Sequence, residues 1–316
     1  MVLTQKKRPK PITIEIMGGI GNQLFAFIAG TYLSSTLGTS LRVFLREKRP
    51  GESVHTSSIE SLAIGTVIER HTPPVERLSL LLRRQMRFFA LRLGASEKRA
   101  SELSRIHVSS SIGADPLLLS CQEGYYVSGY FQSHEYFKFL KEKDALPPLS
   151  LLKPSKWFNA QLERIKAEQP IAIHVRRGDY LKSENEFIGA LSRKYYLQAI
   201  ALARQSISHG TQTKVWIFTD DPKMVEQELG PHINGDFEFV VPPEDSDPSE
   251  SMILMSTAKA IVISNSTFSW WAAALGGKKI VIAPSKWFRG HEDPVGLIPE
   301  TWIRAQSHWL TRDFSG

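Results

Sequence analysis

The fold of this chain is decided at residues 171–180, which read Ile171-Ala172-Ile173-His174-Val175-Arg176-Arg177-Gly178-Asp179-Tyr180. The stretch begins as a largely apolar run and turns within a few residues into a charged loop that contains a glycine. A short apolar run of this kind is typical of a strand that is buried on both faces of a parallel sheet. Polar groups that directly follow such a strand lie at the carboxyl edge of the sheet, where open α/β folds bind their ligands.

The residues around this stretch repeat the alternation of helix and strand. We expect helices at 157–168, 195–206, 222–229, 252–258 and 268–275, and strands at 171–175, 215–218, 237–241, 260–263 and 279–283. Strands that alternate with helices of this length predict a doubly wound parallel sheet.

The first part of the chain opens with the same pattern. An apolar strand at 12–17 precedes a glycine-rich turn at 18–22, a helix at 23–37 and a strand at 41–45. A further strand is expected at 125–129 and a helix at 133–143. Pro147, Pro148 and Pro154 then interrupt the pattern, because proline stops helices and removes a hydrogen-bond donor. We therefore predict two domains, residues 1–153 and residues 154–316.

Composition restricts the class of protein and its compartment. A chain of 316 residues with 42% hydrophobic residues can bury a sizeable core. Cys121 is the single cysteine, so an internal disulfide is impossible, which fits a reducing compartment. The apolar run at 11–17 is too short for a signal peptide or a membrane span. These features predict a cytoplasmic protein.

The net charge of +7 and the pI near 9.4 favour anionic partners: nucleotide phosphates, nucleic acid or an acidic membrane surface. Much of the excess lies at residues 76–105, where basic and apolar residues interleave as in a basic amphipathic helix. One interpretation is a packed helix with a solvated basic face, which the general behaviour of surface helices favours. The other is peripheral contact with the inner face of the cell membrane.

Two loops carry groups that suit a sugar phosphate. Arg176 and Arg177 follow a strand, so a guanidinium can offer paired donors to a diphosphate whose charge rises as it leaves. An arginine pair in surface salt bridges is the alternative. Residues 264–267, Ser264-Asn265-Ser266-Thr267, precede a helix, so their hydroxyls and backbone amides can converge on an anion. Simple N-capping of that helix is compatible with this role.

The sequence favours no metal site and no cofactor. Asp220 and Asp221 are a pair of carboxylates that could hold Mg²⁺, but Asp221 followed by Pro222 is also typical of a helix cap. We prefer the cap, because the two arginines already supply the positive charge. The nine histidines show no zinc-ligand spacing.

Four separated motifs together resemble the bacterial α-1,2-fucosyltransferase family, glycosyltransferase family 11. They are Gly18-Gly19-Ile20-Gly21-Asn22-Gln23-Leu24-Phe25, Gly129-Tyr130-Phe131-Gln132-Ser133, residues 174–180, and Asn265-Ser266-Thr267-Phe268-Ser269-Trp270-Trp271. The resemblance runs from about residue 12 to residue 283. It implies an α/β fold of GT-B type, with two Rossmann-like domains that face a cleft. It also implies that GDP-fucose binds the C-terminal domain, that a galactose-terminated oligosaccharide or lipid-linked glycan binds largely the N-terminal one, and that no metal is required.

The resemblance also implies roles for individual residues. Arg176 and Arg177 would neutralise the diphosphate, assisted by Asn265, Ser266 and Thr267. His174 would lie near the nucleotide, and Asn22 would reach the donor from across the cleft.

The guanine contact departs from the family pattern. Related enzymes commonly place a carboxylate five residues before the position of Ser256, where this chain has Ser251, with Glu250 one place earlier. Glu250 is therefore the candidate for the guanine contact.

Transfer from a β-linked nucleotide sugar to an α-linked product inverts the anomeric carbon, so a single displacement is expected. Asp179 is the first candidate for the base that takes the proton of the acceptor hydroxyl, with Glu184 and Glu186 as rivals. Asp179 could instead only orient an arginine by an ion pair. Two other functions remain open: a fucosyltransferase of another linkage, such as α-1,6, or one that uses a different GDP-sugar, and a basic nucleotide- or RNA-binding module. The position of the polar motifs at strand ends argues against the binding module.

Overall fold

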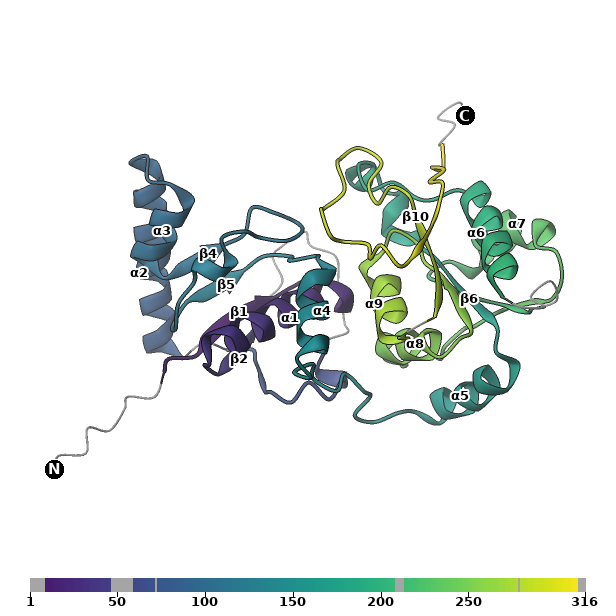
Figure 1. Ribbon diagram of the computed structural model, residues 1–316, viewed down its shortest axis with the longest axis horizontal. Helices are drawn as coiled ribbons and strands as arrows, with labels where there is room; N and C mark the ends of the chain where they lie inside the picture. Colours follow the sequence, from purple (N-terminus) through teal and green to yellow (C-terminus); the bar gives the residue numbers. More distant parts are fainter. Residues whose placement is uncertain (1–8, 47–58, 72, 208–212, 278, 312–316) are drawn as a thin grey trace. The chain divides into compact units, whose positions relative to one another are not determined.

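The structure is a computed structural model that describes residues 9–46, 59–71, 73–207, 213–277 and 279–311. The chain divides into two compact units, each built on its own parallel sheet (Figure 1). Unit 1 comprises Met1–Leu149 and Pro294–Leu297, and unit 2 comprises Ser150–Asp293 and Ile298–Gly316. The observed boundary falls among the prolines that predicted it, a few residues before the expected position.

The sequence pattern does not predict that residues 294–297, which follow most of unit 2, belong to unit 1. Within unit 1, the backbone N–H of His134 donates to the carbonyl of Gly296, with an N···O distance of 2.8 Å. The imidazole Nδ1 of His134 lies 2.6 Å from the same oxygen. These two contacts fix residues 294–297 against the beginning of a helix of unit 1.

Unit 1 has the strand order β3-β2-β1-β5-β4, and every described pairing in it is parallel. Its elements are β1 (Ile12–Ile16), α1 (Ile20–Leu37), β2 (Leu41–Leu45), η1 (Ile59–Ser61), β3 (Ile68–Glu69), α2 (Pro74–Arg92), α3 (Glu97–Ser104), β4 (Ile106–Val108), η2 (Leu118–Ser120), β5 (Tyr126–Ser128) and α4 (His134–Glu142). Side chains alternate along β1, so Ile14 packs against α1 while Glu15 faces α2.

Unit 2 has the strand order β11-β10-β9-β6-β7-β8, again with parallel pairings throughout the described strands. Its elements are α5 (Lys156–Glu168), β6 (Ile171–Val175), η3 (Gly178–Leu181), η4 (Ser183–Asn185), α6 (Arg193–Ser206), β7 (Val215–Thr219), α7 (Pro222–Leu229), η6 (Gly230–His232), β8 (Phe237–Phe239), α8 (Pro248–Ser256), β9 (Ala260–Val262), α9 (Thr267–Leu275), β10 (Ile280–Pro284) and β11 (Ile303–Ala305). Numbered within the unit, this is the order 3-2-1-4-5-6 of a Rossmann fold.

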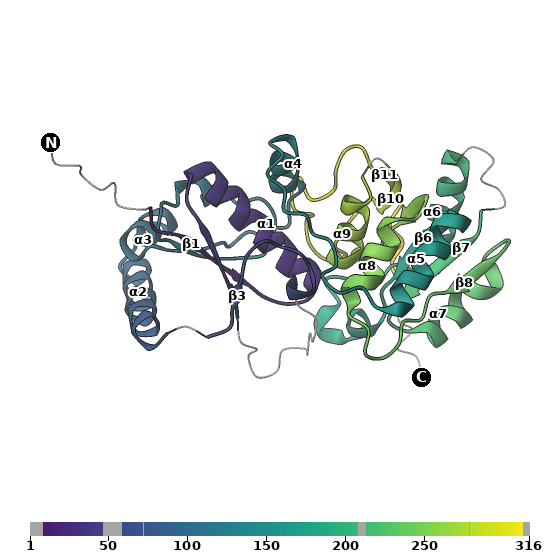
Figure 2. The same ribbon diagram turned by 90° about the horizontal axis from the view of Figure 1, so that it is seen from below.

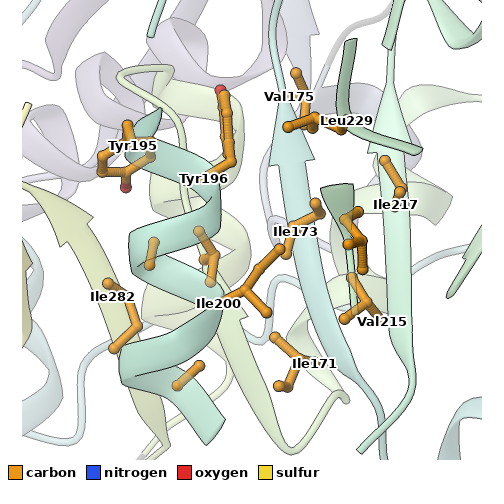
Figure 3. Close-up of a cluster of buried hydrophobic side chains, with 14 of the residues drawn as sticks. Ile171, Ile173, Val175, Tyr195, Tyr196, Ile200, Val215, Ile217, Leu229 and Ile282 are labelled. Atoms are coloured by element: carbon orange, nitrogen blue, oxygen red, sulfur yellow. The ribbon is translucent and has the colours of Figure 1, made fainter. Parts of the chain in front are cut away.

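Both faces of the unit 2 sheet are covered, which explains its continuous apolar strands. Ile171, Ile173 and Val175 pack with Tyr196 and Ile200 of α6 on one face (Figure 3). On the other face, the Trp216 ring lies under the guanidinium of Arg164 from α5, and the His174 ring lies 5.3 Å from the ring of Phe268 from α9. Figures 1 and 2 show α6 and α9 on opposite sides of this sheet.

These observations confirm the predicted α/β class with two Rossmann-like parallel-sheet domains. The predicted strands and helices of unit 2 are present with small shifts at their ends. Trp270, Trp271 and Cys121 are buried. Burial raises the pKa of the Cys121 thiol to about 12. A cleft between the domains stays a prediction.

Three expectations about unit 1 were wrong or incomplete. Helix α1 begins at Ile20 instead of residue 23, since the turn is completed earlier by Gly18, whose φ of +73° favours glycine. The basic segment forms two helices, α2 and α3, because Gly94 adopts a φ of +86° between them. Strands β3 and β4 are too short to give a periodic signal, and so were not expected.

None of the helices within the described ranges combines the length and the apolar character needed to cross a bilayer. The basic residues before Pro9 and those of residues 47–58 lie outside the described part of the chain.

Candidate active site

The strand order of unit 2 places its ligand crevice between β6 and β9. These strands are neighbours in the sheet, but the chain leaves them in opposite directions, and open α/β folds bind their ligands in the crevice between the loops that diverge at such a point. His174, on β6, and Ser264, two residues after β9, join the two strand ends. The imidazole Nδ1 of His174 lies 2.8 Å from the Ser264 hydroxyl oxygen. The predicted motifs at 174–180 and 264–267 therefore meet at this one point.

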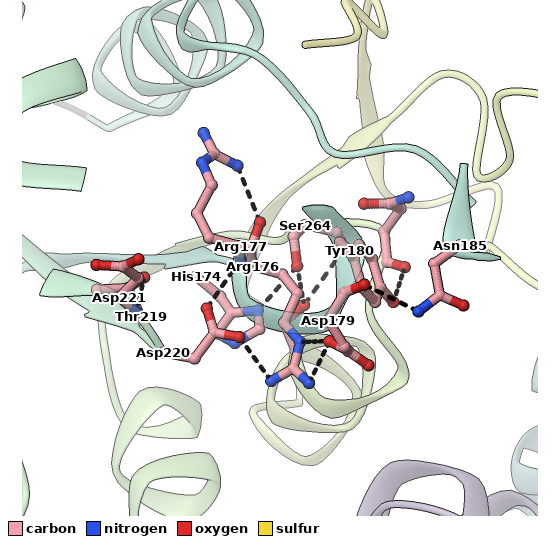
Figure 4. A network of polar contacts seen from close by, with 12 residues as sticks. His174, Arg176, Arg177, Asp179, Tyr180, Asn185, Thr219, Asp220, Asp221 and Ser264 are labelled. Atoms are coloured by element: carbon pink, nitrogen blue, oxygen red, sulfur yellow. Dashed lines mark hydrogen bonds and ion pairs between the residues drawn. The ribbon is translucent and has the colours of Figure 1, made fainter. Parts of the chain in front are cut away.

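Arg176 points from the end of β6 into a cluster of acidic groups (Figure 4). Its Nε and Nη2 donate to Oδ1 of Asp179, at 3.0 and 2.7 Å, and its Nη1 lies 3.0 Å from Oδ2 of Asp220. Its side chain keeps 29% of its surface exposed. Burial acts to lower the pKa of Arg176, but Asp220 and Asp179 outweigh it and raise that pKa. The guanidinium is thus charged, oriented by two carboxylates and still accessible.

Tyr180 connects Arg176 to the second loop. The guanidinium carbon of Arg176 lies 5.7 Å from the centre of the Tyr180 ring, and the Tyr180 hydroxyl donates to the backbone carbonyl of Asn265 at 3.1 Å. Burial raises the pKa of Tyr180 to about 12, so its hydroxyl keeps its proton at neutral pH. The role of Tyr180 as a link between the two loops could not be read from the sequence.

Arg177 has the opposite environment from Arg176. Its side chain is fully buried, and its Nε and Nη2 donate to the carboxylate of Glu228 on α7 at 2.8 to 3.0 Å. Its Nη1 donates to the backbone carbonyl of Arg176, and its guanidinium lies over the ring of Tyr196. The predicted contact of Arg177 with a diphosphate does not fit this burial. The geometry gives Arg177 a structural role instead.

The carboxylate of Asp220 contacts both arginines. Its Oδ1 accepts a hydrogen bond of 2.8 Å from the backbone N–H of Arg177, while its Oδ2 faces Arg176. A Cβ on Gly178 would stand 2.4 Å from that Oδ2, so only glycine allows Asp220 to approach so closely. Asp221 caps α7 by accepting from the backbone N–H of Met224 at 3.0 Å, which confirms the predicted cap.

Residues 264–267 form the second side of the crevice. Ser266 is the N-cap residue of α9, yet its side chain makes no capping hydrogen bond. The amides of the first turn of a helix have no intrahelical partner, and an anion can satisfy them. The side-chain amide of Asn265 donates to the carbonyls of Ile188, Gly189 and Trp287 at 2.9 to 3.1 Å. Asn265 thus holds surrounding loops in place, while Ser266 and Thr267 stand at the helix start.

His174 is buried and uncharged. Its side chain is 5% exposed, and burial, followed by the charge of Arg176, lowers its pKa to about 3. A neutral imidazole is expected near a cationic guanidinium, because a second positive charge would be repelled. The geometry assigns His174 to joining the ends of β6 and β9, and its predicted contact with the nucleotide stays a prediction.

Glu250 does not lie free for a guanine base. It is 3% exposed, and its carboxylate accepts from the backbone N–H of Ser155 at 2.6 Å and from the Ser155 hydroxyl at 2.8 Å. Glu250 therefore secures the N-cap of α5, and the guanine contact predicted for it does not fit its burial.

The remaining candidates lie elsewhere. Asn22, in unit 1, accepts a hydrogen bond of 3.1 Å from the side chain of Gln132, so it joins the first two family motifs within that unit. Glu186 is 69% exposed and lies 3.9 Å from Arg289. The side chain of Glu184 lies outside what the structure describes. Among the candidate bases whose side chains are described, Asp179 alone contacts Arg176.

One cavity near the site could accept a ligand. A cavity of about 280 Å³ in unit 2 borders the loop that follows Tyr180. It is lined by Tyr180, Leu181, Lys182, Ser183, Glu186, Gly189, Ala190, Arg289, Leu310 and Thr311.

Across the described residues, no group of three or more His, Cys, Asp and Glu side chains converges in a way that could hold a metal ion.

Sequence reasoning missed Glu228 and the electrostatic role of Asp220. Glu228 stands three residues after Val225 on α7, so helical spacing places it on the inward face beside that buried residue. An acidic residue on the buried face of a helix was the available signal for a partner of Arg177. The role of Asp220 depends on the pairing of β6 with β7, which no local pattern contains.

Comparisons with known proteins identify relatives of this chain. It is 25% identical to the α-1,2-colitosyltransferase of Escherichia coli over 313 residues, which cover 93% of this chain and 99% of that protein. It is 36% identical over 137 residues to the O-antigen biosynthesis glycosyltransferase WbnK of Escherichia coli, covering 42% of this chain and 43% of that one. Among solved structures, fucosyltransferase NodZ from Bradyrhizobium is similar with a TM-score of 0.48 and 14% identity, over 84% of this chain and 93% of that chain.

The family comparison covers the whole crevice of unit 2. The sequence profile of glycosyl transferase family 11 matches residues 107–292, which is more than half of the chain and includes both loops of the crevice. This protein belongs to glycosyl transferase family 11.

Proposed function

We propose that this chain is an inverting galactoside 2-α-L-fucosyltransferase. It would move L-fucose from GDP-β-L-fucose to the 2-hydroxyl of a terminal galactose, without a metal ion. The observation that carries the proposal is the accessible guanidinium of Arg176, held between Asp179 and Asp220 and connected through Tyr180 to the loop before α9. Membership of glycosyl transferase family 11 and the α-1,2 linkage in the name of a relative support it.

Arg176 is the residue to which we assign the diphosphate. As the bond between fucose and phosphate breaks, negative charge grows on the departing GDP, and a nearby guanidinium lowers the energy of that state. Asp179 and Asp220 keep the guanidinium in one orientation, which reduces the entropy lost when it binds the nucleotide. The first-turn amides of α9 and the hydroxyls of Ser266 and Thr267 would supply further donors to phosphate oxygens.

Asp179 has two candidate roles, and its contact with Arg176 favours that of a positioning residue. A carboxylate oxygen that accepts two hydrogen bonds from a guanidinium is committed to that partner. The base role stays the alternative. Asp179→Asn keeps the shape of the side chain and removes its charge. A positioning role predicts a raised KM for GDP-fucose together with a lower kcat, whereas loss of a base predicts a fall in kcat of roughly 10² to 10⁴ at unchanged GDP affinity.

The acceptor and the compartment belong to the same proposal. A galactose-terminated oligosaccharide or a lipid-linked glycan is the acceptor class that the family resemblance implies, and one relative is named for O-antigen biosynthesis. We assign the reaction to the cytoplasm, which agrees with a single, buried and unpaired cysteine.

A different GDP-linked sugar is the strongest alternative for the donor, because a relative with 25% identity over nearly the whole chain is named a colitosyltransferase. The test is a matrix of donors and acceptors: GDP-L-fucose, GDP-colitose and GDP-mannose against β-galactosides, with the product linkage determined by NMR. Transfer of fucose to the 2-hydroxyl of galactose is the expected result. Exclusive use of another donor, or a 1,6 linkage, would refute the finer assignment.

The role of Arg176 has its own test with a matched control. Arg176→Gln removes the charge, and because a hydrogen bond to a charged group contributes about 1.5–3 kcal/mol, GDP affinity should fall by roughly 10- to 100-fold. Arg164→Gln is the control. Arg164 is also paired with two carboxylates, those of Glu168 and Glu238. It lies on α5, which leads into the amino end of β6, whereas Arg176 follows the carboxyl end of that strand. Equal loss of GDP affinity in both variants would contradict the assignment.

Independence of metal is tested with EDTA. We expect unchanged transfer after extensive chelation and no stimulation by added Mg²⁺ or Mn²⁺. Loss of activity that Mg²⁺ restores would overturn this part of the proposal.

A further inference from the structure

Helix α2 leaves one whole face uncovered. Its inner face carries half-buried Leu80, Arg83, Arg87 and Leu91. The opposite face presents large apolar side chains at intervals of three and four residues, so that they align along the helix. This outer stripe consists of Val75, Leu78, Leu82, Met86, Phe89 and Leu93, whose exposed fractions are 83, 61, 59, 50, 55 and 86%. A helix packed in the usual way would bury such a stripe.

Basic residues border the outer stripe. The neighbouring row along the helix consists of Arg77, Leu81, Arg84, Phe88 and Arg92, all of them exposed. Residues 74–105 together hold eight arginines and lysines but three glutamates. Each of these glutamates already has a cationic partner, since Glu76 pairs with Arg42, Glu97 with Arg87 and Glu102 with Arg99. Cations therefore outnumber carboxylates by five in this segment, and the surface around the stripe is positive.

We propose that the outer stripe of α2 docks this protein on an anionic lipid bilayer. A helix with an apolar stripe beside a basic row lies in the plane of a membrane, with its apolar side chains among the acyl chains and its cations at the headgroups. The long stems of Arg77 and Arg92 allow their charges to reach phosphate groups while the stripe is inserted, whereas Arg84 is paired with Glu15. The proposal goes beyond the transfer reaction and does not depend on which sugar is moved.

A second copy of the chain fits this surface less well. In a symmetric dimer the same patch meets itself, so the excess of positive charge around each stripe would face an equal excess on the other copy. An anionic bilayer matches both the apolar and the charged part of the surface. Contiguous exposed apolar patches of this kind are uncommon on monomeric soluble proteins and mark sites of interaction.

The experiment measures flotation of the full chain with vesicles of phosphatidylcholine alone and of phosphatidylcholine with phosphatidylglycerol. The stripe variant is Leu82→Ser with Phe89→Ser. Its matched control is Val67→Ser with Leu119→Ser, which changes exposed apolar residues of the same unit, 80% and 55% exposed, that do not belong to α2. A charge variant, Arg77→Gln with Arg92→Gln and Lys98→Gln, tests the basic residues. Circular dichroism and thermal unfolding check that each variant is folded.

We expect the wild type and the control to float with anionic vesicles, and both the stripe variant and the charge variant to lose at least tenfold in vesicle partitioning. High salt should weaken the binding of the wild type, because the attraction of exposed charges is screened. Absence of wild-type binding to anionic vesicles, or binding that the stripe variant retains, would overturn the proposal. So would a lipid-free dimer, seen by analytical ultracentrifugation, that the stripe variant dissociates, since the stripe would then be a contact between copies.

Discussion

The contact between Arg177 and Glu228 offers the sharpest test of the site. The perturbation is Glu228→Ala, which removes the carboxylate beneath a guanidinium that has no exposed surface. Three of the described hydrogen bonds of Arg177 end on Glu228, with N···O distances of 3.0, 2.9 and 2.8 Å. One further side-chain hydrogen bond, to the carbonyl of Arg176, and the contact with the ring of Tyr196 remain after the change.

The expected cost follows from the burial of the charge. Removal of one partner of a buried ion pair costs about 3–5 kcal/mol, because the remaining charge stays out of water without compensation. Unit 2, residues 150–293 and 298–316, has the size for which 1 kcal/mol shifts Tm by about 2–4 °C. Glu228→Ala should therefore lower the Tm of this unit by roughly 6–20 °C. Replacing both partners, in Arg177→Met with Glu228→Leu, should recover much of that loss, since no unpaired charge is then buried.

The assay combines thermal unfolding with GDP binding by calorimetry at a temperature where every variant is folded. Arg176→Gln should lose GDP affinity with a small change in Tm. Arg177→Met and Glu228→Ala should have a lower Tm, and the folded fraction of each variant should bind GDP with the affinity of the wild type. A loss of less than 1 kcal/mol in Glu228→Ala would refute the structural role of the pair. A loss of GDP affinity in a fully folded Arg177→Met equal to that in Arg176→Gln would restore Arg177 as a phosphate ligand.

Three other predictions concern the loops of the crevice. Gly178→Ala should lower the free energy of unfolding by about 1–3 kcal/mol and weaken GDP binding, because the added methyl group would displace Asp220; calorimetric binding and urea unfolding check both. His174 has a folded pKa of about 3, below its unfolded value near 6.5, so stability should fall as pH drops below 6.5, by about 2 kcal/mol at pH 5. Urea unfolding at pH 7.5 and pH 5 should show a shallower loss in His174→Asn, and equal slopes in both proteins would refute the assignment. Asn265→Ala should cost about 1–3 kcal/mol, and Asn265→Asp more, since a buried carboxylate would then face three carbonyl oxygens; equal Tm values for the two variants would contradict this.

The sequence determined the class of fold and the position of the site along the chain. Both are local in origin: apolar strands such as 171–175 alternate with helices, and polar motifs directly follow two of those strands. A parallel sheet brings the carboxyl ends of its strands to one edge, so motifs ninety residues apart could be expected to meet. Short strands such as β3 and β4 escaped prediction because two or three residues carry no measurable periodicity.

Tertiary structure alone decided which polar residues are free to act. Arg176 and Arg177 are adjacent and chemically identical in the sequence, yet the turn after β6 sends one guanidinium into the crevice and the other under α7. Nothing in the sequence around Glu250 indicates that its carboxylate accepts a hydrogen bond from Ser155, the N-cap residue of α5. The physical reason is that the burial of a side chain depends on which distant elements pack around it, and that information is spread over strand pairings such as that of β6 with β7. The sequence therefore identified the loops of the site, and tertiary packing determined that Arg176, and not Arg177, is accessible to a ligand.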